Sequence, residues 1–168
     1  AVGFLAKHNA SIAGAEVGCQ GEIGVASAMG AAFLADAWGD SARVIGERGE
    51  FGLCVAPLDL MEQVDHCGHT HGDRVDKFAL TGLTRTAAAK IDAPLIAECP
   101  VCLECRLTRT VDLDTHRAFF AEVVATHVPE RYLAADGSPD LQRMNVLCFA
   151  DGAYWVLGKR LKPLYYTR

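Results

Sequence analysis

The sequence lacks several patterns that would assign a function directly. It has no concentrated basic stretch and carries a formal net charge of −5, so a nucleic-acid partner is not expected. Its longest apolar stretch, residues 25–37, is interrupted by polar residues and glycine and is too short to cross a bilayer. The first residues do not have the charged head, apolar middle and cleavage site of a signal peptide. These absences predict a cytoplasmic protein that binds neither nucleic acid nor a membrane.

Motifs for nucleotide and hydrolase sites are also missing. The sequence contains no G-x-G-x-x-G and no Walker A motif, so a nicotinamide cofactor would bind without a Rossmann domain. No serine lies in a G-x-S-x-G context, so a serine hydrolase has no support. The seven cysteines are odd in number and scattered, which favours reduced thiols in a cytoplasm over a disulfide framework.

The residues that are present divide the chain into two parts of different character. Residues 1–39 are poor in charge and rich in glycine and alanine. Within them, 23–37 is predicted to form a helix that is apolar nearly all round and therefore buried. Short helices and apolar, β-branched strands are predicted over the rest. We expect a helical segment over 1–39 and a separate domain over 40–168.

The larger part is predicted to be mainly β with short helices. Pro57 ends an apolar strand, and Asp59 is predicted to cap the helix that follows it. Asp151 and Gly152 form a strong turn dipeptide between the last two strands. The predicted helices cover 41–48, 59–66 and 74–80, and the predicted strands cover 51–56, 95–110 (one strand or a pair), 116–128, 146–150 and 153–157.

Three stretches carry a resemblance to a known family. They are EFGLCVAP at 50–57, HGDRVDKFALTGL at 71–83 and APLIAECPVCLEC at 93–105. In this order and spacing, residues 41–168 resemble the flavoredoxin-type branch of the flavin reductase family. The resemblance implies a six-stranded split β-barrel that works as a homodimer and holds FMN noncovalently at the subunit interface. It also implies an oxidoreductase that moves electrons or hydride through bound flavin, supplied by NAD(P)H or by a protein electron donor.

The front of this family's barrel is not found in the sequence. In the family, three strands precede the helix matched here by 41–48, and they supply most contacts to FMN. Residues 1–39 have neither the alternation nor the composition of strands. The expected fold is therefore an FMN-binding split β-barrel that is incomplete at its N-terminal side and preceded by a helical segment. A barrel without those strands would expose two edges.

The resemblance places a flavin site after the second predicted helix. A histidine, an arginine and a lysine there offer donors and positive charge for a phosphate around a glycine that lets the backbone approach. The alternative is that residues 74–77 form a solvated helix face, and that the tryptophan belongs to a core or dimer interface. No catalytic residue is named, because the flavin would carry the chemistry. The cofactor-binding candidates are His71, Gly72, Asp73, Arg74, Lys77, Phe78 and Trp155.

Residues 7–24, KHNASIAGAEVGCQGEIG, resemble a second family, the iron–sulfur L-serine dehydratases. That resemblance implies that Cys19 is one of three ligands to a [4Fe–4S] cluster. The other two ligands are not found, so a buried free cysteine is the alternative for Cys19. Two further functions therefore stay open beside the flavin reductase: a fragment of an L-serine dehydratase, and a non-enzymatic fused or truncated scaffold with an incomplete flavin site.

Two clusters of soft ligands invite a metal interpretation. Cys99, Cys102 and Cys105 are spaced like cluster ligands. Alternation along a strand predicts, however, that Cys102 points away from the other two. The histidines and cysteine of 66–71 could bind zinc or nickel adventitiously, but they coincide with the resembled flavin loop. We expect no dedicated metal site.

Overall fold

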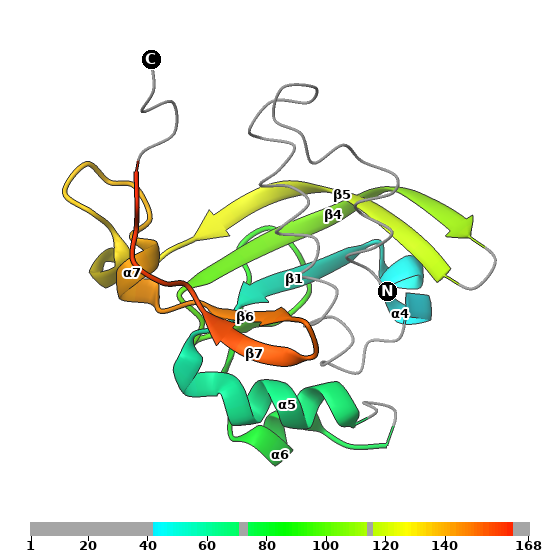
Figure 1. The fold of residues 1–168 in the computed structure, drawn as a ribbon. Coiled ribbons are helices and arrows are strands. Elements are labelled where there is room, and N and C mark those ends of the chain that lie inside the picture. Colours follow the sequence, from blue (N-terminus) through cyan, green and yellow to red (C-terminus); the bar gives the residue numbers. More distant parts are fainter. Residues whose placement is uncertain (1–41, 71–73, 114–115, 163–168) are drawn as a thin grey trace.

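The computed structural model describes residues 42–70, 74–113 and 116–162 of the chain (Figure 1). The segment 1–39, with its predicted helix over 23–37, lies outside the described residues. No helix in the described ranges is long and apolar enough to cross a membrane. The described residues are mainly β-structure with short helices, as predicted.

The largest sheet has three antiparallel strands in the order β1, β4, β5 (Figure 1). These strands are β1 (Glu50–Val55), β4 (Val101–Leu113) and β5 (His116–His127). Register shifts between residues 104 and 105 and between 107 and 109 interrupt the β4–β5 pairing. In the part of the chain that the structure describes, β1 pairs with β4 alone, so these strands form an open sheet rather than a closed barrel.

The stretch 95–110 forms two strands rather than one, and these two strands belong to different sheets. β3 (Leu95–Ile96) pairs with β2 (Arg85–Thr86), and a turn then leads into β4. The Cys99 amide donates to the Ile96 carbonyl at 3.2 Å and closes that turn. The turn changes the direction of the chain, so Cys99 lies outside the alternation of β4.

The helices are short, and hydrogen bonds at their ends stabilise them. α4 (Ala42–Arg48) is followed by Gly49, whose φ of 73° suits a glycine, and the Gly49 amide donates to the Ile45 carbonyl at 3.0 Å. α6 (Lys77–Thr81) begins where the Asp76 carboxylate accepts hydrogen bonds from two amides and ends at Gly82 in the left-handed region. The predicted helix over 74–80 therefore starts three residues later than expected.

The prediction that Asp59 caps the next helix was wrong. Asp59 lies inside a 3₁₀ turn, η1 (Leu58–Leu60), which runs directly into α5 (Met61–His69). The residue before α5 is Leu60, which makes no side-chain cap hydrogen bond. A tight 3₁₀ entry satisfies the first turn through backbone bonds, as in the Leu60 amide donating to the Pro57 carbonyl at 3.1 Å.

The C-terminal hairpin is as predicted. β6 (Leu147–Ala150) and β7 (Ala153–Val156) pair around Asp151 and Gly152, whose φ angles of 50° and 70° fit a two-residue hairpin turn. Tyr154 donates its hydroxyl to the Asp65 carboxylate at 2.9 Å, which docks the hairpin on α5 (Figure 1). Before the hairpin come η2 (Glu130–Tyr132) and α7 (Leu141–Met144).

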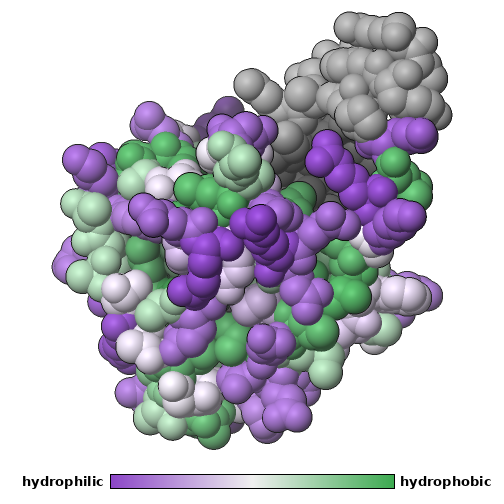
Figure 2. Space-filling model, turned by 90° about the vertical axis from the view of Figure 1, so that its left-hand side faces the viewer, coloured by the Kyte–Doolittle hydropathy of each residue, from purple (hydrophilic) through white to green (hydrophobic). Residues whose placement is uncertain are grey.

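The core lies between β1, β4, the β3 segment and α5. Its buried residues are Cys54, Ala56, Leu60, Val64, Leu95, Ile96, Cys99 and Cys102. Gly52 is required here, because a Cβ at that position would lie 2.8 Å from both the Leu95 side chain and the Pro94 carbonyl oxygen. On the face nearest α7, apolar side chains are interspersed with polar ones (Figure 2).

Candidate functional site

The predicted flavin segment joins α5 to α6. His71, Gly72 and Asp73, three of its candidates, lie outside the described residues. The structure describes what flanks them: Thr70 at the end of α5, and Arg74, Lys77 and Phe78 on the far side. The contacts of these flanking residues show how the connection is held.

Two side chains tie the connection back onto the last turn of α5. Thr70 donates its hydroxyl to the His66 carbonyl at 2.7 Å. Lys77, which is only 5% exposed, donates from Nζ to the Cys67 carbonyl at 2.8 Å. The final carbonyls of a helix have no partners within the helix, and a cation there also meets the negative end of the helix dipole. The two bonds therefore hold both ends of the connection at one place on α5.

Lys77 is thus not part of a solvated helix face, and that alternative was wrong for this residue. Its ammonium is directed to the backbone carbonyl of Cys67. The buried position makes Lys77 a residue that positions the segment. Arg74, by contrast, is exposed.

Asp76 organises the beginning of α6. Its carboxylate accepts from the Phe78 amide at 3.0 Å and the Ala79 amide at 3.3 Å, and lies 3.4 Å from the Arg85 guanidinium. The hydrogen bond from Ala79 lowers the pKa of Asp76, desolvation opposes this, and the Phe78 amide and Arg85 reinforce it. The carboxylate is therefore ionised at neutral pH and fixes the direction of the helix that carries Lys77 and Phe78.

The Phe78 ring was predicted to form an apolar wall. It packs partly against the core, and the Arg85 guanidinium lies 4.2 Å from its ring centroid. A guanidinium over an aromatic face is a favourable cation–π contact. Asp76, Phe78 and Arg85 thus form one connected unit beside Arg74.

Trp155 occupies a different place. It is 55% exposed, and its indole Nε1 donates to the Ala150 carbonyl at 2.8 Å within its own hairpin. Its neighbour Tyr154 reaches α5, and successive side chains of a strand point to opposite faces. The structure therefore brings Arg74, Lys77 and Phe78 together on one segment and sets Trp155 on the other face of the hairpin.

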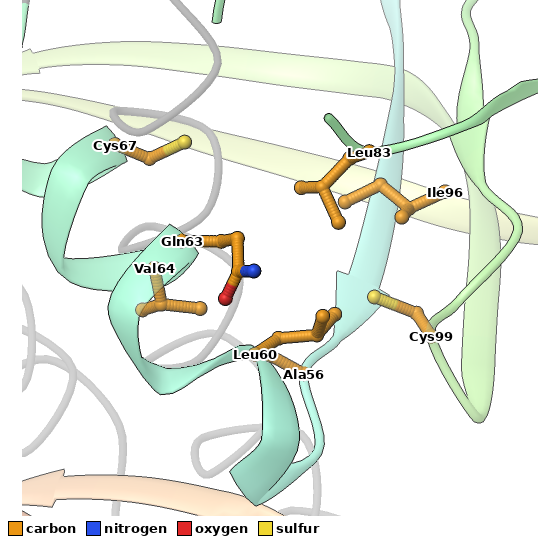
Figure 3. A pocket seen from close by; sticks show the side chains of 8 residues that line it. All are labelled: Ala56, Leu60, Gln63, Val64, Cys67, Leu83, Ile96 and Cys99. Atoms are coloured by element: carbon orange, nitrogen blue, oxygen red, sulfur yellow. The ribbon is translucent and has the colours of Figure 1, made fainter. Parts of the chain in front are cut away.

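A small pocket beside α5 was not anticipated from the sequence. Its cavity volume is only about 10 Å³, and it is lined by Ala56, Leu60, Gln63, Val64, Cys67, Leu83, Ile96 and Cys99 (Figure 3). The Gln63 Oε1 atom is buried there without a hydrogen-bond partner among the described residues. Cofactor pockets usually have about 300–1,000 Å³, so this space does not suit a whole flavin. A glutamine on the apolar face of α5 was the available sequence signal.

The prediction that Cys102 points away from the other two cysteines was wrong for Cys99. Cys99, Cys102 and Cys105 are all buried, and Cys99 and Cys102 belong to the same core cluster. Cys99 lies in the turn before β4, whereas the unbroken pairing of β1 with β4 keeps Cys102 and Cys105 on opposite faces of the strand. Across the described ranges, no group of three His, Cys, Asp or Glu side chains is arranged to hold a metal ion.

A buried carboxylate in β4 was also missed. Glu104 accepts from the Ala89 amide at 2.7 Å, the Lys90 amide at 2.6 Å and His127 Nε2 at 2.5 Å. Burial raises the pKa of Glu104, but these hydrogen bonds outweigh it and lower the pKa to about 2. The carboxylate fastens the 89–90 turn to the sheet, so its role is structural. A charged residue amid buried cysteines was the sequence signal.

Two known protein families match the chain, and their matches overlap over residues 28–53. The flavin reductase like domain matches residues 28–158. The serine dehydratase alpha chain matches residues 1–53. Over 53 residues the chain is 55% identical to L-serine dehydratase 1 of Escherichia coli K12, which covers 32% of this chain and 12% of that protein. Both predicted resemblances are confirmed.

Solved structures agree over the larger part. Flavoredoxin of Desulfovibrio vulgaris (Miyazaki F) superposes with a TM-score of 0.70 and 30% identity over 74% of this chain and 68% of that one. An FMN-binding protein from Thermus thermophilus shares the fold, with a TM-score of 0.60 and 19% identity over 72% and 66% of the two chains. The chain spans 54% or less of the length of the first curated relatives that it matches. On the match over residues 28–158 and the likeness to flavoredoxin, the chain belongs to the flavin reductase-like domain family.

Proposed function

We propose that this protein binds FMN at the α5–α6 connection and transfers electrons or hydride through it. The observation that carries the proposal is the pair of bonds from Thr70 and Lys77 to the end of α5. They hold a segment with exposed positive charge in one place, inside the region matched by the flavin reductase-like family. A phosphate site gains affinity when its donors are held before the ligand arrives.

The residues present fit the phosphate end of FMN by their chemistry. Arg74 supplies an exposed guanidinium, whose planar fork suits a phosphate. Lys77 orients the segment through its hydrogen bond to the Cys67 carbonyl. The cation–π contact between Phe78 and Arg85 holds the adjoining helix α6 in place. When bound, the flavin supplies the redox chemistry, while the protein supplies binding, orientation and electrostatics. His71, Gly72 and Asp73 complete the proposed segment, and Trp155 is assigned no contact at this end.

The family resemblance extends the proposal to the assembly. A homodimer would place a second subunit beside the flavin, and NAD(P)H or a redox protein would supply the electrons. The open edge of β1 among the described strands supports a partner or another segment on that side. Size-exclusion chromatography with light scattering, with and without FMN, tests the assembly. A monomer in both conditions would contradict it.

The cofactor proposal is tested by titrating the purified chain with FMN and following flavin fluorescence and the visible spectrum. We expect saturable binding that weakens roughly 10- to 100-fold in Arg74→Ala, the size expected for a charge-assisted hydrogen bond. Arg131→Ala is the matched control, because Arg131 is an exposed arginine in η2, over the Tyr132 ring. A chain that leaves the FMN spectrum unchanged would overturn the proposal.

A second candidate function rests on the N-terminal match. Because residues 1–53 match the serine dehydratase alpha chain, Cys19 could serve as a ligand to an iron–sulfur cluster that dehydrates serine. The chain spans only 12% of the E. coli enzyme, so the flavin function is preferred. Iron and acid-labile sulfide analysis of anaerobically purified protein separates the two. Stoichiometric iron and sulfide would favour the dehydratase, and their absence with bound FMN would favour the reductase.

A further inference from the structure

Two buried cysteines face each other across the central strand pair. In the β1–β4 register Cys54 lies opposite Cys102. The Leu107 amide donates to the Gly49 carbonyl at 2.8 Å, which makes that pair a hydrogen-bonded one. Hydrogen-bonded and non-hydrogen-bonded pairs alternate along antiparallel strands, so Cys54 and Cys102 form a non-hydrogen-bonded pair. At such pairs the Cα atoms are about 4.5 Å apart, within the range of about 4.4–6.8 Å that a disulfide spans.

The two thiols also converge on one residue. Cys54 Sγ accepts from the Ile96 amide at 3.4 Å, and Cys102 Sγ donates to the Ile96 carbonyl at 3.4 Å. The thiols of Cys54 and Cys102 also lie close enough to shift each other's pKa. Both sulfur atoms thus lie on the same face of the sheet, against the same backbone.

A third thiol connects this pair to the pocket beside α5. Cys99 is in contact with Cys54 and lines the pocket, with its sulfur directed into the space (Figure 3). An oxidant small enough to enter this space can therefore reach Cys99, which shares the pocket lining with Cys67. Cys54 lies next to Cys99, and Cys102 lies beyond Cys54.

We propose that Cys54 and Cys102 are a redox modification site at which a peroxide forms a reversible cross-strand disulfide, with Cys99 as the entry thiol. Hydrogen peroxide oxidises the Cys99 thiol to a sulfenic acid and is reduced to water. The Cys54 thiol then displaces a second water and forms a Cys54–Cys99 disulfide. The Cys102 thiol attacks the Cys54 sulfur, passes its proton to Cys99, and leaves a Cys54–Cys102 disulfide. In sum, two thiols and one peroxide give one disulfide and two waters.

Because the site is buried, we expect the disulfide to form slowly and to be reduced slowly. The Cys102 contact lowers the pKa of Cys54, but the Cys99 contact and burial raise it to about 12. The contact with Cys54 and burial also raise the pKa of Cys102. Few thiolates exist at neutral pH, so bulky alkylating reagents should modify the half-buried Cys148 first. A disulfide formed inside the core is shielded in the same way from reduction by large thiols.

The test uses the full chain carrying Cys19→Ala, which removes the cysteine outside the described residues. After peroxide treatment, remaining thiols are alkylated in denaturant and the protein is digested with trypsin. The expected product joins peptide 49–74 to peptide 91–106, with fragmentation assigning the bond to Cys54 and Cys102. The cross-link closes a long loop, so we also expect a rise of roughly 5–15 °C in melting temperature, reversed by dithiothreitol.

Single variants separate the roles. Cys99→Ala should slow disulfide formation at least tenfold without changing the product. Cys102→Ala should trap the Cys54–Cys99 bond. Cys148→Ala should change neither the product nor the rate. Full retention of the Cys54 and Cys102 thiols after prolonged peroxide treatment of folded protein would overturn the proposal, and so would cross-links confined to Cys67 or Cys105. The peptide map of the parent chain decides this even if a variant does not fold.

Discussion

Two regions of this molecule are rich in the side chains that bind ligands, and the fold uses them in opposite ways. The α5–α6 connection has histidine, lysine and arginine, and its exposed Arg74 lies at the surface. The turn into β4 and the first residues of β4 have three cysteines, and all of them are buried. In the first region, the hydrogen bonds from Thr70 and Lys77 anchor the connection to α5, and the Arg74 guanidinium is exposed to solvent. In the second, polarisable sulfur fills the core. Residue type alone does not separate a binding segment from a packed interior, whereas burial does.

The contrast between exposed and buried charge is clearest for Arg74 and Lys77, which lie close together in the sequence. Both are cations that the sequence offers equally to a phosphate. The structure buries Lys77 against the Cys67 carbonyl and leaves Arg74 in solvent. One cation then positions the segment, and the other remains available to a ligand.

The largest effect is expected from a substitution in the buried core. Leu95 is among the most buried side chains and touches the cysteine cluster. Leu95→Ala should lower the free energy of unfolding by about 2–5 kcal/mol, because it removes buried methyl groups and leaves a cavity. Urea denaturation measures this loss. Leu161→Ala, at a residue that is 87% exposed, is the control and should change the free energy little. Equal effects would contradict the assigned core.

The next largest effect is expected from removing the hydrogen bond that anchors the α5–α6 connection. Lys77→Met keeps the length and apolar stem of the side chain but removes the donor to Cys67. We expect FMN affinity to fall roughly tenfold, because the segment must then be ordered when the ligand binds. Isothermal titration calorimetry measures the change, with Lys90→Met as the control at an exposed lysine. Unchanged affinity in folded Lys77→Met would show that the anchor does not position the site.

A smaller effect concerns the cap of α6. Asp76→Ala removes the acceptor for the Phe78 and Ala79 amides and should lower the melting temperature by roughly 2–4 °C. The pKa of Asp76 is lowered in the fold, so its contribution is complete above the unfolded pKa. That contribution is lost as pH falls through the folded pKa. Thermal melts at pH 7 and pH 2.5 check this: the difference between parent and variant should shrink at the lower pH.

The smallest effect is expected on the hairpin. Because Trp155 faces away from α5, Trp155→Phe should change FMN affinity less than threefold and stability by about 0.5 kcal/mol or less. Fluorescence titration with FMN measures the first and urea denaturation the second. A loss of affinity as large as that of Arg74→Ala would place Trp155 at the flavin.

Local signals predicted much of the fold. The turn at Asp151 and Gly152, the strand before Pro57 and the long strand after 116 all follow from residue preferences that act over a few positions. The start of α5 did not follow, because a 3₁₀ turn replaced a side-chain cap. Cap geometry depends on how the preceding strand leaves the sheet, which short sequence windows do not contain.

The site was predicted less completely, for the same physical reason. The segment around Arg74 was found by its residues, but the burial of Lys77 depends on α5 lying within reach of its side chain. Glu104 was missed because its hydrogen-bond partners come from distant parts of the chain. Gln63 was missed because only the folded structure shows that its buried Oε1 has no partner among the described residues. The relation of Cys102 to Cys99 was mistaken because Cys99 lies in a turn, outside the alternation of β4.

The sequence by itself determined the resemblance to two families, the mainly β character of the larger part and the identity of the charged segment, because these depend on residue order and local preference. Only the tertiary structure decided which cation is buried, which carboxylate is enclosed and that Cys54 meets Cys102. The last of these depends on pairing residues that are 48 positions apart along the chain. The packing of one face of a sheet sets burial, and burial sets what each of these groups can do.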